Sequence, residues 1–212
     1  MELIIMNRTD IPVKYKKNTA VSDLVKIAFF AVLIAVCTWI SIPSQIPFTL
    51  QTLAIFTALG ILGGKKGTIV IGIYILLGLI GIPVFSNFRG GIGVLAGATG
   101  GYIMGFIFTG LLYWAITAVL YRFCRTKRAE IIVSAIAMVL GNIVCYAAGT
   151  AYFIIIYAKS SGGIGVGAAL SMCVLPFIIP DLIKIGVALF ISKVSGLSRR
   201  FGADRSSRRQ GQ

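Results

Sequence analysis

Asp181 and Lys184 are the residues of this sequence whose types and spacing most directly suggest chemistry. Asp181 is the only one of six acidic residues that lies inside a long apolar segment. A charge in the middle of a membrane helix costs about 2.5–3.5 kcal/mol on insertion scales. The i, i+3 spacing places both side chains on one helix face, where pairing offsets much of that cost. Pro176 and Pro180 precede the pair and are expected to loosen this helix. The pattern predicts either a structural ion pair or a cavity for a ligand that both donates and accepts hydrogen bonds.

Metal and catalytic chemistry find little support in the sequence. It contains no His, and its four Cys residues are scattered without CxxC spacing, so no familiar metal site can be assembled. There is no carboxylate pair and no activated Ser pattern for acid–base or nucleophilic catalysis. Segment 60–66 lacks the spacer and the final Ser or Thr of a phosphate-binding loop. We therefore expect no enzyme, no cofactor and no ATPase site in this chain.

Six apolar segments must position the two charges. Of the 212 residues, 58% are hydrophobic and only 12% are charged, against about 25% charged in an average globular domain. Lipid must therefore be the solvent for most of the surface. Lys65 and Lys66 separate the second segment from the third, because one continuous helix would bury both ammonium groups. The sequence predicts an all-α integral membrane protein with six transmembrane helices. The apolar segments are 24–42, 50–63, 68–82, 101–121, 131–157 and 171–192.

Basic residues alternate along the chain and predict its orientation. Seventeen of the 20 Lys and Arg residues lie at or before the start of the first segment, in the second and fourth connections, or after the last segment. The positive-inside rule then places both termini in the cytoplasm. This pattern explains the net charge of +14, so we expect no nucleic acid partner. The predicted parts are a cytoplasmic N-terminal segment (1–23), a six-helix transmembrane domain (24–194) and a basic cytoplasmic tail (195–212).

Two connections on the predicted outer side are apolar and rich in Gly and Pro, namely Ser41–Gln51 and Gly81–Gly93. Irregular backbone near membrane depth survives only when it is buried in protein or lines a cavity. These connections predict a shaped lid over the outer half of the last helix, with an interfacial aromatic belt as the alternative.

Small residues indicate helix contacts in two places. Ala28, Ala31 and Ala35 form a strip on one face of the first helix, which predicts contact either within the bundle or with another subunit. Glycines spaced four apart over 97–105 predict close packing of the fourth helix against a neighbour.

Four strings of the sequence together resemble one family. They are Ile46–Leu53 (IPFTLQTL), Gly81–Gly93 (GIPVFSNFRGGIG), Ala98–Gly105 (ATGGYIMG) and Val174–Lys184 (VLPFIIPDLIK). Over about residues 24–194 the chain resembles the BioY family, the biotin-specific substrate-binding (S) components of energy-coupling factor (ECF) transporters. The resemblance implies the ECF S-component fold in a prokaryotic cell membrane. It also implies capture of biotin from the outer face and delivery inward with a transmembrane coupling subunit and two cytoplasmic ATPase subunits.

The resemblance also implies roles for individual residues. Asp181 would accept from the ureido N–H groups of biotin, and Asn87 or Lys184 would donate to its carbonyl. Arg89 would meet the valerate carboxylate, and Ala31 with Ala35 resembles the contact with the coupling subunit. The full set of substrate-binding candidates is Asp181, Lys184, Asn87, Arg89, Gln51 and Tyr102.

Two alternative hypotheses stay open at this point. The chain could be an S component for another small vitamin, such as thiamine or riboflavin, or a membrane scaffold without a ligand. Ligand-dependent thermal stabilisation separates the three, because a tight ligand raises stability in proportion to RT ln(1 + [L]/Kd).

Overall fold

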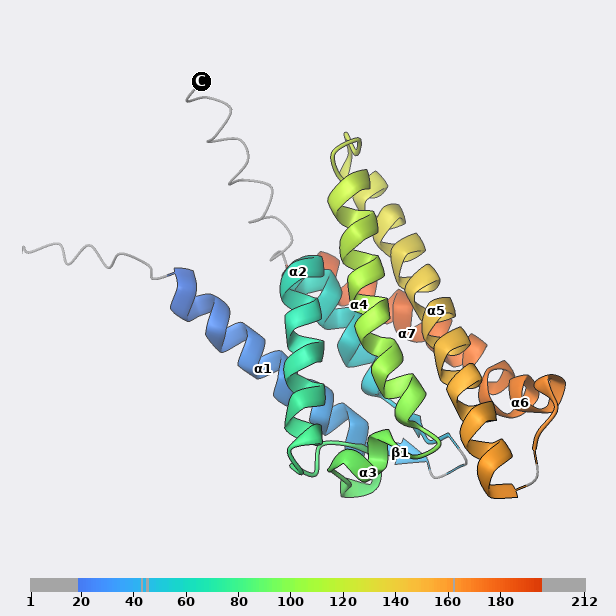
Figure 1. The fold of residues 1–212 in the computed structure, drawn as a ribbon. Coiled ribbons are helices and arrows are strands. Elements are labelled where there is room, and N and C mark those ends of the chain that lie inside the picture. Colours follow the sequence, from blue (N-terminus) through green and yellow to red (C-terminus); the bar gives the residue numbers. More distant parts are fainter. Residues whose placement is uncertain (1–18, 43, 45, 162, 196–212) are drawn as a thin grey trace, which may run out of the picture.

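The structure, a computed structural model, describes residues 19–42, 44, 46–161 and 163–195. Long helices run alongside one another as a bundle, and short elements gather at one end of it (Figure 1). This architecture confirms the predicted all-α class. The long helices are α1 (Thr19–Trp39), α2 (Gln51–Leu79), α4 (Gly100–Leu120), α5 (Lys127–Ser161) and α7 (Leu175–Val194). The short elements are β1 (Ser41–Ile42), β2 (Phe48–Thr49), η1 (Ser86–Phe88), α3 (Ile92–Leu95) and α6 (Val166–Cys173).

Helix α2 is a hairpin of two antiparallel limbs that turns at Gly63. This glycine has φ 78° and ψ 168°, a conformation outside the helical region that favours Gly. Gln51 Nε2 lies 3.1 Å from the hydroxyl of Tyr74, whereas a straight helix would separate these residues by about 35 Å. The predicted hairpin is therefore confirmed. Its turn is tighter than expected, because Lys65 and Lys66 already belong to the second limb.

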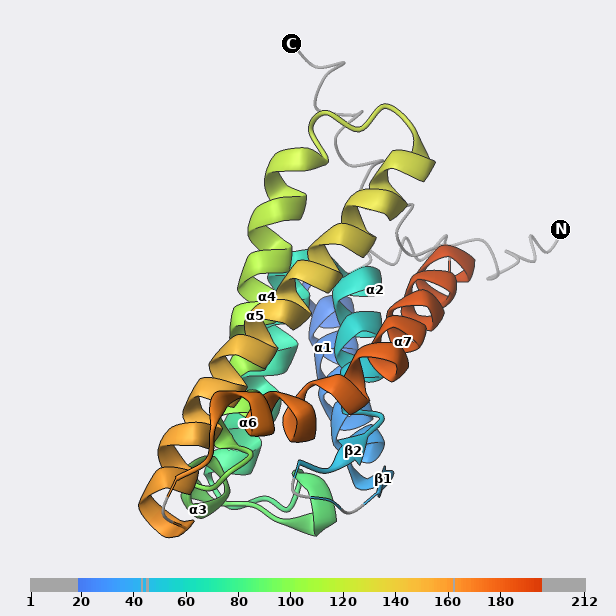
Figure 2. The same ribbon diagram turned by 90° about the vertical axis from the view of Figure 1, so that its right-hand side faces the viewer.

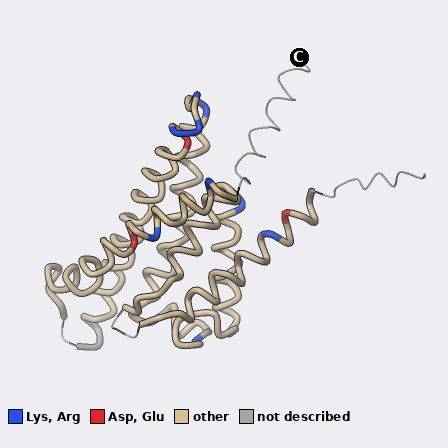
Figure 3. Tube along the Cα trace, turned by 180° about the vertical axis from the view of Figure 1, so that it is seen from behind, with Lys and Arg blue, Asp and Glu red and all other residues tan. Residues whose placement is uncertain are grey.

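Five helical segments among the described residues are long and apolar enough to cross a membrane, and one of them contains both limbs of α2. Lys and Arg gather at the bundle end formed by the α2 turn and the α4–α5 connection, away from the short elements (Figure 3). This distribution agrees with the predicted polarity. The number of spans and their orientation stay predictions, and segments 1–18 and 196–212, which carry many of the basic residues, lie outside the described part.

Glycines let α4 and α5 approach closely. A Cβ on Gly101 would lie 2.4 Å from Cβ of Tyr152, and one on Gly105 would lie 2.8 Å from Sγ of Cys145. On the other helix, a Cβ on Gly141 would lie 2.9 Å from the methyl group of Thr109. These approaches confirm the predicted packing for Gly101 and Gly105, whereas Gly97 precedes α4 and approaches only the backbone of its own segment. They also bring the polar residues of α5 near the centre of the bundle.

The alanine strip of α1 is divided between the protein interior and its surface. Ala31 and Ala35 are buried in the core, and α1 packs against α2. Ala28 is exposed, and the N-terminal part of α1 projects away from the bundle (Figure 1). Of the two possibilities that the sequence left open, contact within the bundle therefore holds for Ala31 and Ala35. A contact of Ala28, Ala31 and Ala35 with a partner subunit stays a prediction, and of the three only Ala28 is exposed.

The connection between α1 and α2 contains secondary structure that the sequence did not predict. Ser41 pairs with Thr49 and Ile42 pairs with Phe48 in a two-stranded antiparallel ladder of β1 and β2. Strands of two residues are too short to show an alternating pattern, so their sequence reads as irregular. The ladder leads the chain directly into α2 at Gln51.

The last apolar segment is broken into two helices. Val174 separates α6 from α7 with φ −124° and ψ −55°, and Pro176 lies in the first turn of α7. Proline fits the first turn of a helix because the amide hydrogen there has no intrahelical partner. Helix α6 lies across the bundle, whereas α7 runs along it (Figure 2). The break places Asp181 and Lys184 near the beginning of α7, facing inward.

Candidate functional site

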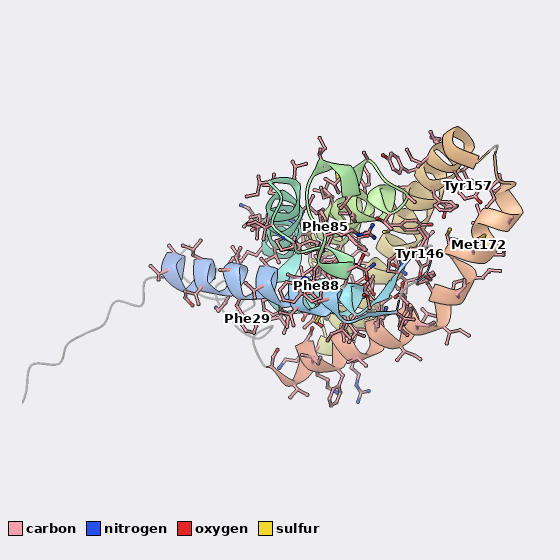
Figure 4. All side chains as sticks on the ribbon, turned by 90° about the horizontal axis from the view of Figure 1, so that it is seen from below. Phe29, Phe85, Phe88, Tyr146, Tyr157 and Met172 are labelled. Carbon is pink, nitrogen blue, oxygen red and sulfur yellow. The ribbon has the colours of Figure 1, made fainter. Side chains whose placement is uncertain are left out.

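A cavity lies between the helices and the short elements at the end opposite the basic residues. About 660 Å³ of space free of protein atoms lies there, open solvent at the mouth included. Its walls come from α1, α4, α5, α6 and α7, from both limbs of α2, and from the segments around 46–49 and 85–86. Seen from this end, Phe85 and Tyr146 lie between the helices, whereas Phe29 and Met172 lie at the periphery (Figure 4).

Asp181 is the most highly connected polar residue of the cavity wall. Its residue surface is 2% exposed. Its Oδ1 accepts from Lys184 Nζ at 2.9 Å and from Thr52 Oγ1 at 3.0 Å. Its Oδ2 accepts from the Tyr146 hydroxyl at 2.5 Å and from Asn142 Nδ2 at 3.4 Å. A carboxylate buried this deeply is tolerable because a cation and three further donors surround it.

Lys184 connects α7 to the beginning of α2. Its ammonium group donates to Asp181, to Oγ1 of Thr52 at 3.0 Å and to the backbone carbonyl of Thr49 at 2.8 Å. All three of its hydrogens therefore have acceptors. The nitrogen also lies 4.3 Å from the centroid of the Phe48 ring, where the face of an aromatic ring attracts a cation. Lys184 thus holds β2 and the first turn of α2 against α7.

A second polar cluster closes the cavity near the lid. The hydroxyl of Tyr74 contacts Gln51 Nε2 at 3.1 Å, Thr38 Oγ1 at 3.2 Å and the carbonyl of Val84 at 3.2 Å. The ring of Phe85 packs edge-on against Tyr74 with centroids 5.7 Å apart. These contacts join α1, both limbs of α2 and the segment before η1.

The segment 81–91 is fastened to α1 by an aromatic residue. Trp39 Nε1 donates to the carbonyl of Pro83 at 2.9 Å, and its ring stacks on Phe88 at a centroid distance of 5.0 Å. Asn87 and Phe88 have φ of 58° and 55°, a left-handed conformation that is uncommon for residues other than Gly. The segment is therefore folded over the cavity, as the lid prediction requires, with Phe85 inside and Phe88 outside.

The structure brings together four of the six predicted substrate-binding residues. Asp181, Lys184, Gln51 and Tyr102 all line the cavity. The Tyr102 hydroxyl pairs with Thr150 Oγ1 at 2.8 Å across the interface of α4 and α5.

Asn87 and Arg89 do not line the cavity in this structure. Both are exposed, since the left-handed turn directs the chain outward at this point. Arg89 instead borders a depression formed with Gly90, Gly93 and Thr99. Thr99 belongs to the walls of both the depression and the cavity. Ligand contact by Asn87 and Arg89 stays a prediction.

Sequence reasoning missed three side chains that contact Asp181 directly: Thr52, Asn142 and Tyr146. Asn142 is a buried amide in the middle of an apolar helix, and Tyr146 lies four residues later on the same face. The argument that singled out Asp181, a costly polar group inside an apolar segment, would also have found Asn142. Thr52 had no such signal, because the hydroxyl of a Thr in a membrane helix can donate to a backbone carbonyl of its own helix at little cost.

The arrangement is built to bind a polar group and not to transform one. Donors and acceptors meet at one wall of an otherwise apolar cavity, which favours a ligand with a compact polar head and an apolar body. Among the described residues, no three His, Cys, Asp or Glu side chains lie together as a metal site would need.

Comparisons with known proteins give consistent matches. The family model described as the BioY family matches residues 9–201. The biotin transporter BioY of Thermotoga maritima is 38% identical over 171 residues, which cover 80% of this chain and 93% of the relative. The biotin transporter BioY2 of Lactococcus lactis subsp. cremoris is 34% identical, with coverage of 79% and 86%. The probable biotin transporter BioY of Pyrococcus horikoshii is 33% identical, with coverage of 79% and 91%.

A solved structure is similar over most of the chain as well. It is a crystal structure of the S-component for biotin from an ECF-type ABC transporter. The two folds superpose with a TM-score of 0.69 at 28% sequence identity, and the match covers 84% of this chain and 93% of that chain.

Proposed function

This chain belongs to the BioY family, and we propose that it is the substrate-binding S component of an ECF-type biotin transporter. Its relatives are named biotin transporters, and the similar structure is described as an S-component for biotin. The observation that carries the proposal is the cavity with the Asp181 cluster in its wall. The protein is then a multi-pass membrane protein of a prokaryote that binds and delivers a vitamin, and it is not an enzyme.

The chemistry of biotin fits this cavity. Its cyclic urea offers two N–H donors and one carbonyl acceptor, and its thiophane ring and valerate chain are mostly apolar. Asp181 accepts from a ureido N–H group, and Lys184 holds that carboxylate in place. The apolar wall from Phe85, Phe106 and Phe177 covers the ring and the chain.

The lid end of the cavity is the proposed place for the valerate carboxylate. Gln51 and Tyr102 lie in the wall, and both carry side chains that donate hydrogen bonds. Arg89 and Asn87 lie outside, on the segment that folds over the mouth. Arg89 meets the carboxylate when the segment moves inward, and a guanidinium group is suited to that contact because its paired N–H groups match both oxygens.

Transport requires partners that supply energy. The family resemblance implies a transmembrane coupling subunit and two cytoplasmic ATPase subunits, and the chain has no phosphate-binding loop of its own. We propose that the exposed apolar face of α1, with Ala28, Leu24 and Phe29, contacts the coupling subunit. In this proposal Ala31 and Ala35 act indirectly, by fixing α1 on the bundle.

A binding titration tests the proposed function. The full chain, purified in detergent, is titrated with biotin by calorimetry, and we expect saturable binding at one site. Asp181→Asn should weaken binding at least tenfold, since a hydrogen bond to a charged group is worth about 1.5–3 kcal/mol. Asp23→Asn is the matched control, because Asp23 also pairs with a lysine but lies on α1, away from the cavity.

Absence of biotin binding to the folded wild-type chain would refute the proposal. Thiamine and riboflavin are titrated in parallel, and tighter binding of either would assign the chain to another vitamin. Equal affinity of wild type and Asp181→Asn for biotin would leave the transporter assignment intact and refute the placement of the ureido group.

A further inference from the structure

In the empty protein, the carboxylate of Asp181 already has as many donors as it can accept. A carboxylate offers about four lone-pair positions, and the four donors here are Lys184, Thr52, Tyr146 and Asn142. A ureido N–H group therefore cannot simply be added. One of the present donors has to leave when the ligand arrives.

The contact from Asn142 is the one that yields at least cost. At 3.4 Å it is the longest of the four, beyond the usual range of about 2.7–3.2 Å for an N–H···O bond. Lys184 and Thr52 also bond to each other, and Lys184 bonds to Thr49. Displacing either would break more than one hydrogen bond, and the Tyr146 contact is the shortest of the set at 2.5 Å.

The orientation of the Asn142 amide follows from simple chemistry. An ionised carboxylate only accepts, so the NH₂ end of the amide must face Asp181. The carbonyl end, Oδ1, makes no hydrogen bond with the described residues, none of whose buried side-chain oxygens lacks a partner. This atom therefore faces the open space of the cavity, whose wall includes Asn142.

An amide carries the same groups as one half of a urea: a carbonyl and an N–H that points at Asp181. We propose that Asn142 is a specificity-determining residue that occupies the place of a ureido N–H in the empty protein. When the ligand enters, Asn142 turns about its terminal torsion and donates Nδ2–H to the ureido carbonyl oxygen. That torsion in Asn is broad, so the turn needs no change in the helix. The inference rests on the proposed function.

A direct consequence concerns ligands that keep the ring but lose the carbonyl. In 2-iminobiotin a cyclic guanidinium replaces the urea, and its imino nitrogen donates and cannot accept. Asn142 therefore donates a hydrogen bond to the carbonyl of biotin but finds no acceptor on the guanidinium of 2-iminobiotin. A site that hydrogen-bonds a substrate group discriminates strongly against an analogue lacking it, because the polar partner of the site is left unpaired.

The test compares biotin with 2-iminobiotin on the full chain in detergent, by calorimetry. We expect Asn142→Leu to weaken biotin binding about tenfold to a hundredfold, and to shrink the preference for biotin over 2-iminobiotin by a similar factor. Ser134→Ala is the control, since Ser134 is a buried polar residue of α5 that does not line the cavity and bonds instead to Tyr121. This variant should leave both affinities unchanged.

Three results decide the matter. A loss of equal size for both ligands, or no loss for either, overturns the role of Asn142 even where wild type binds biotin and Asp181→Asn weakens it. Failure of wild type to bind biotin instead overturns the proposed function. If Asn142→Leu does not fold, Asn142→Ser replaces it, because the hydroxyl keeps a donor in the wall but is too short to follow the ureido oxygen. An unchanged preference for biotin over 2-iminobiotin in that variant also overturns the proposal.

Discussion

The pairing of Asp181 with Lys184 makes a quantitative prediction about stability in the absence of ligand. The two charged atoms lie 2.9 Å apart, with side chains 3% and 8% exposed. At an effective dielectric constant of about 20, Coulomb's law gives an attraction of about 6 kcal/mol at this distance, before the cost of desolvation. Asp181→Asn leaves the ammonium group buried without a counter-charge, and Lys184→Met does the same to the carboxylate. Each single substitution should therefore lower the free energy of unfolding by about 3–5 kcal/mol.

The double substitution removes both charges and should cost far less than the sum of the two singles. We expect its loss to match the larger single loss, so that the coupling energy equals the smaller single loss, about 3–5 kcal/mol. The measurement is equilibrium unfolding of the four proteins in mixed detergent micelles without biotin, followed by helix content. A double variant whose loss equals the sum of the single losses to within about 0.5 kcal/mol would refute the reasoning, because the charges would then not depend on each other.

The chain supplies a matched control for this cycle. Asp23 and Lys66 form a second ion pair at 2.6 Å, but their side chains are 33% and 26% exposed. The same substitutions there, Asp23→Asn and Lys66→Met, should give a coupling energy of at most about 1 kcal/mol. Burial of the charges, and not the distance between them, would then account for the difference in coupling energy between the two ion pairs.

Two further predictions concern glycines and are measured by thermal unfolding and biotin titration. Gly63→Ala should lower the free energy of unfolding by about 1–3 kcal/mol, because φ is 78° at the α2 turn. Gly72→Ala is the control: Gly72 is helical and a Cβ there would meet nothing within 4 Å. This variant should raise the free energy of unfolding by about 0.5–1 kcal/mol. Equal effects of the two would argue against a hairpin. Gly78→Ala should cost about 1–3 kcal/mol and reduce biotin affinity about tenfold, because its Cβ would lie 2.1 Å from Cζ of Phe85 in the cavity wall. Gly186→Ala is the control, because open space surrounds Gly186, and it should change neither the free energy of unfolding nor the biotin affinity. An unaltered biotin affinity in Gly78→Ala would show that Phe85 does not shape the cavity.

The cost of burying charged side chains was enough to predict the α2 hairpin and the inward-facing ion pair from the sequence. Lys65 and Lys66 could not lie in the middle of a membrane helix, so the chain had to turn beside them, and it turns at Gly63. Asp181 and Lys184 could not face lipid, so they had to face each other and the interior, and they do. These predictions succeed because the penalty for the alternative is several kcal/mol and depends on few details.

Predictions about the lid depended on finer effects. Asn87 and Arg89 were placed at the ligand by their position in a resembling string. Both side chains are exposed in the structure, next to the left-handed turn of Asn87 and Phe88, and their contact with a ligand stays a prediction. Backbone dihedral angles of this kind are set by packing of Trp39 and Phe85, which no local pattern reveals. The partners of Asp181 on α2 and α5 were missed for a related reason, because they meet it only through contacts between segments distant in sequence.

The i, i+3 spacing of Asp181 and Lys184 has a consequence for biogenesis. The hydrogen-bond partners of Lys184 outside α7 are separated from it by 132 and 135 residues, but its counter-charge belongs to the same helical turn. When α7 leaves the insertion machinery, the two charges can neutralise each other before any neighbouring helix is in contact. The last helix can therefore partition into lipid as a nearly neutral unit, with its ion pair already formed.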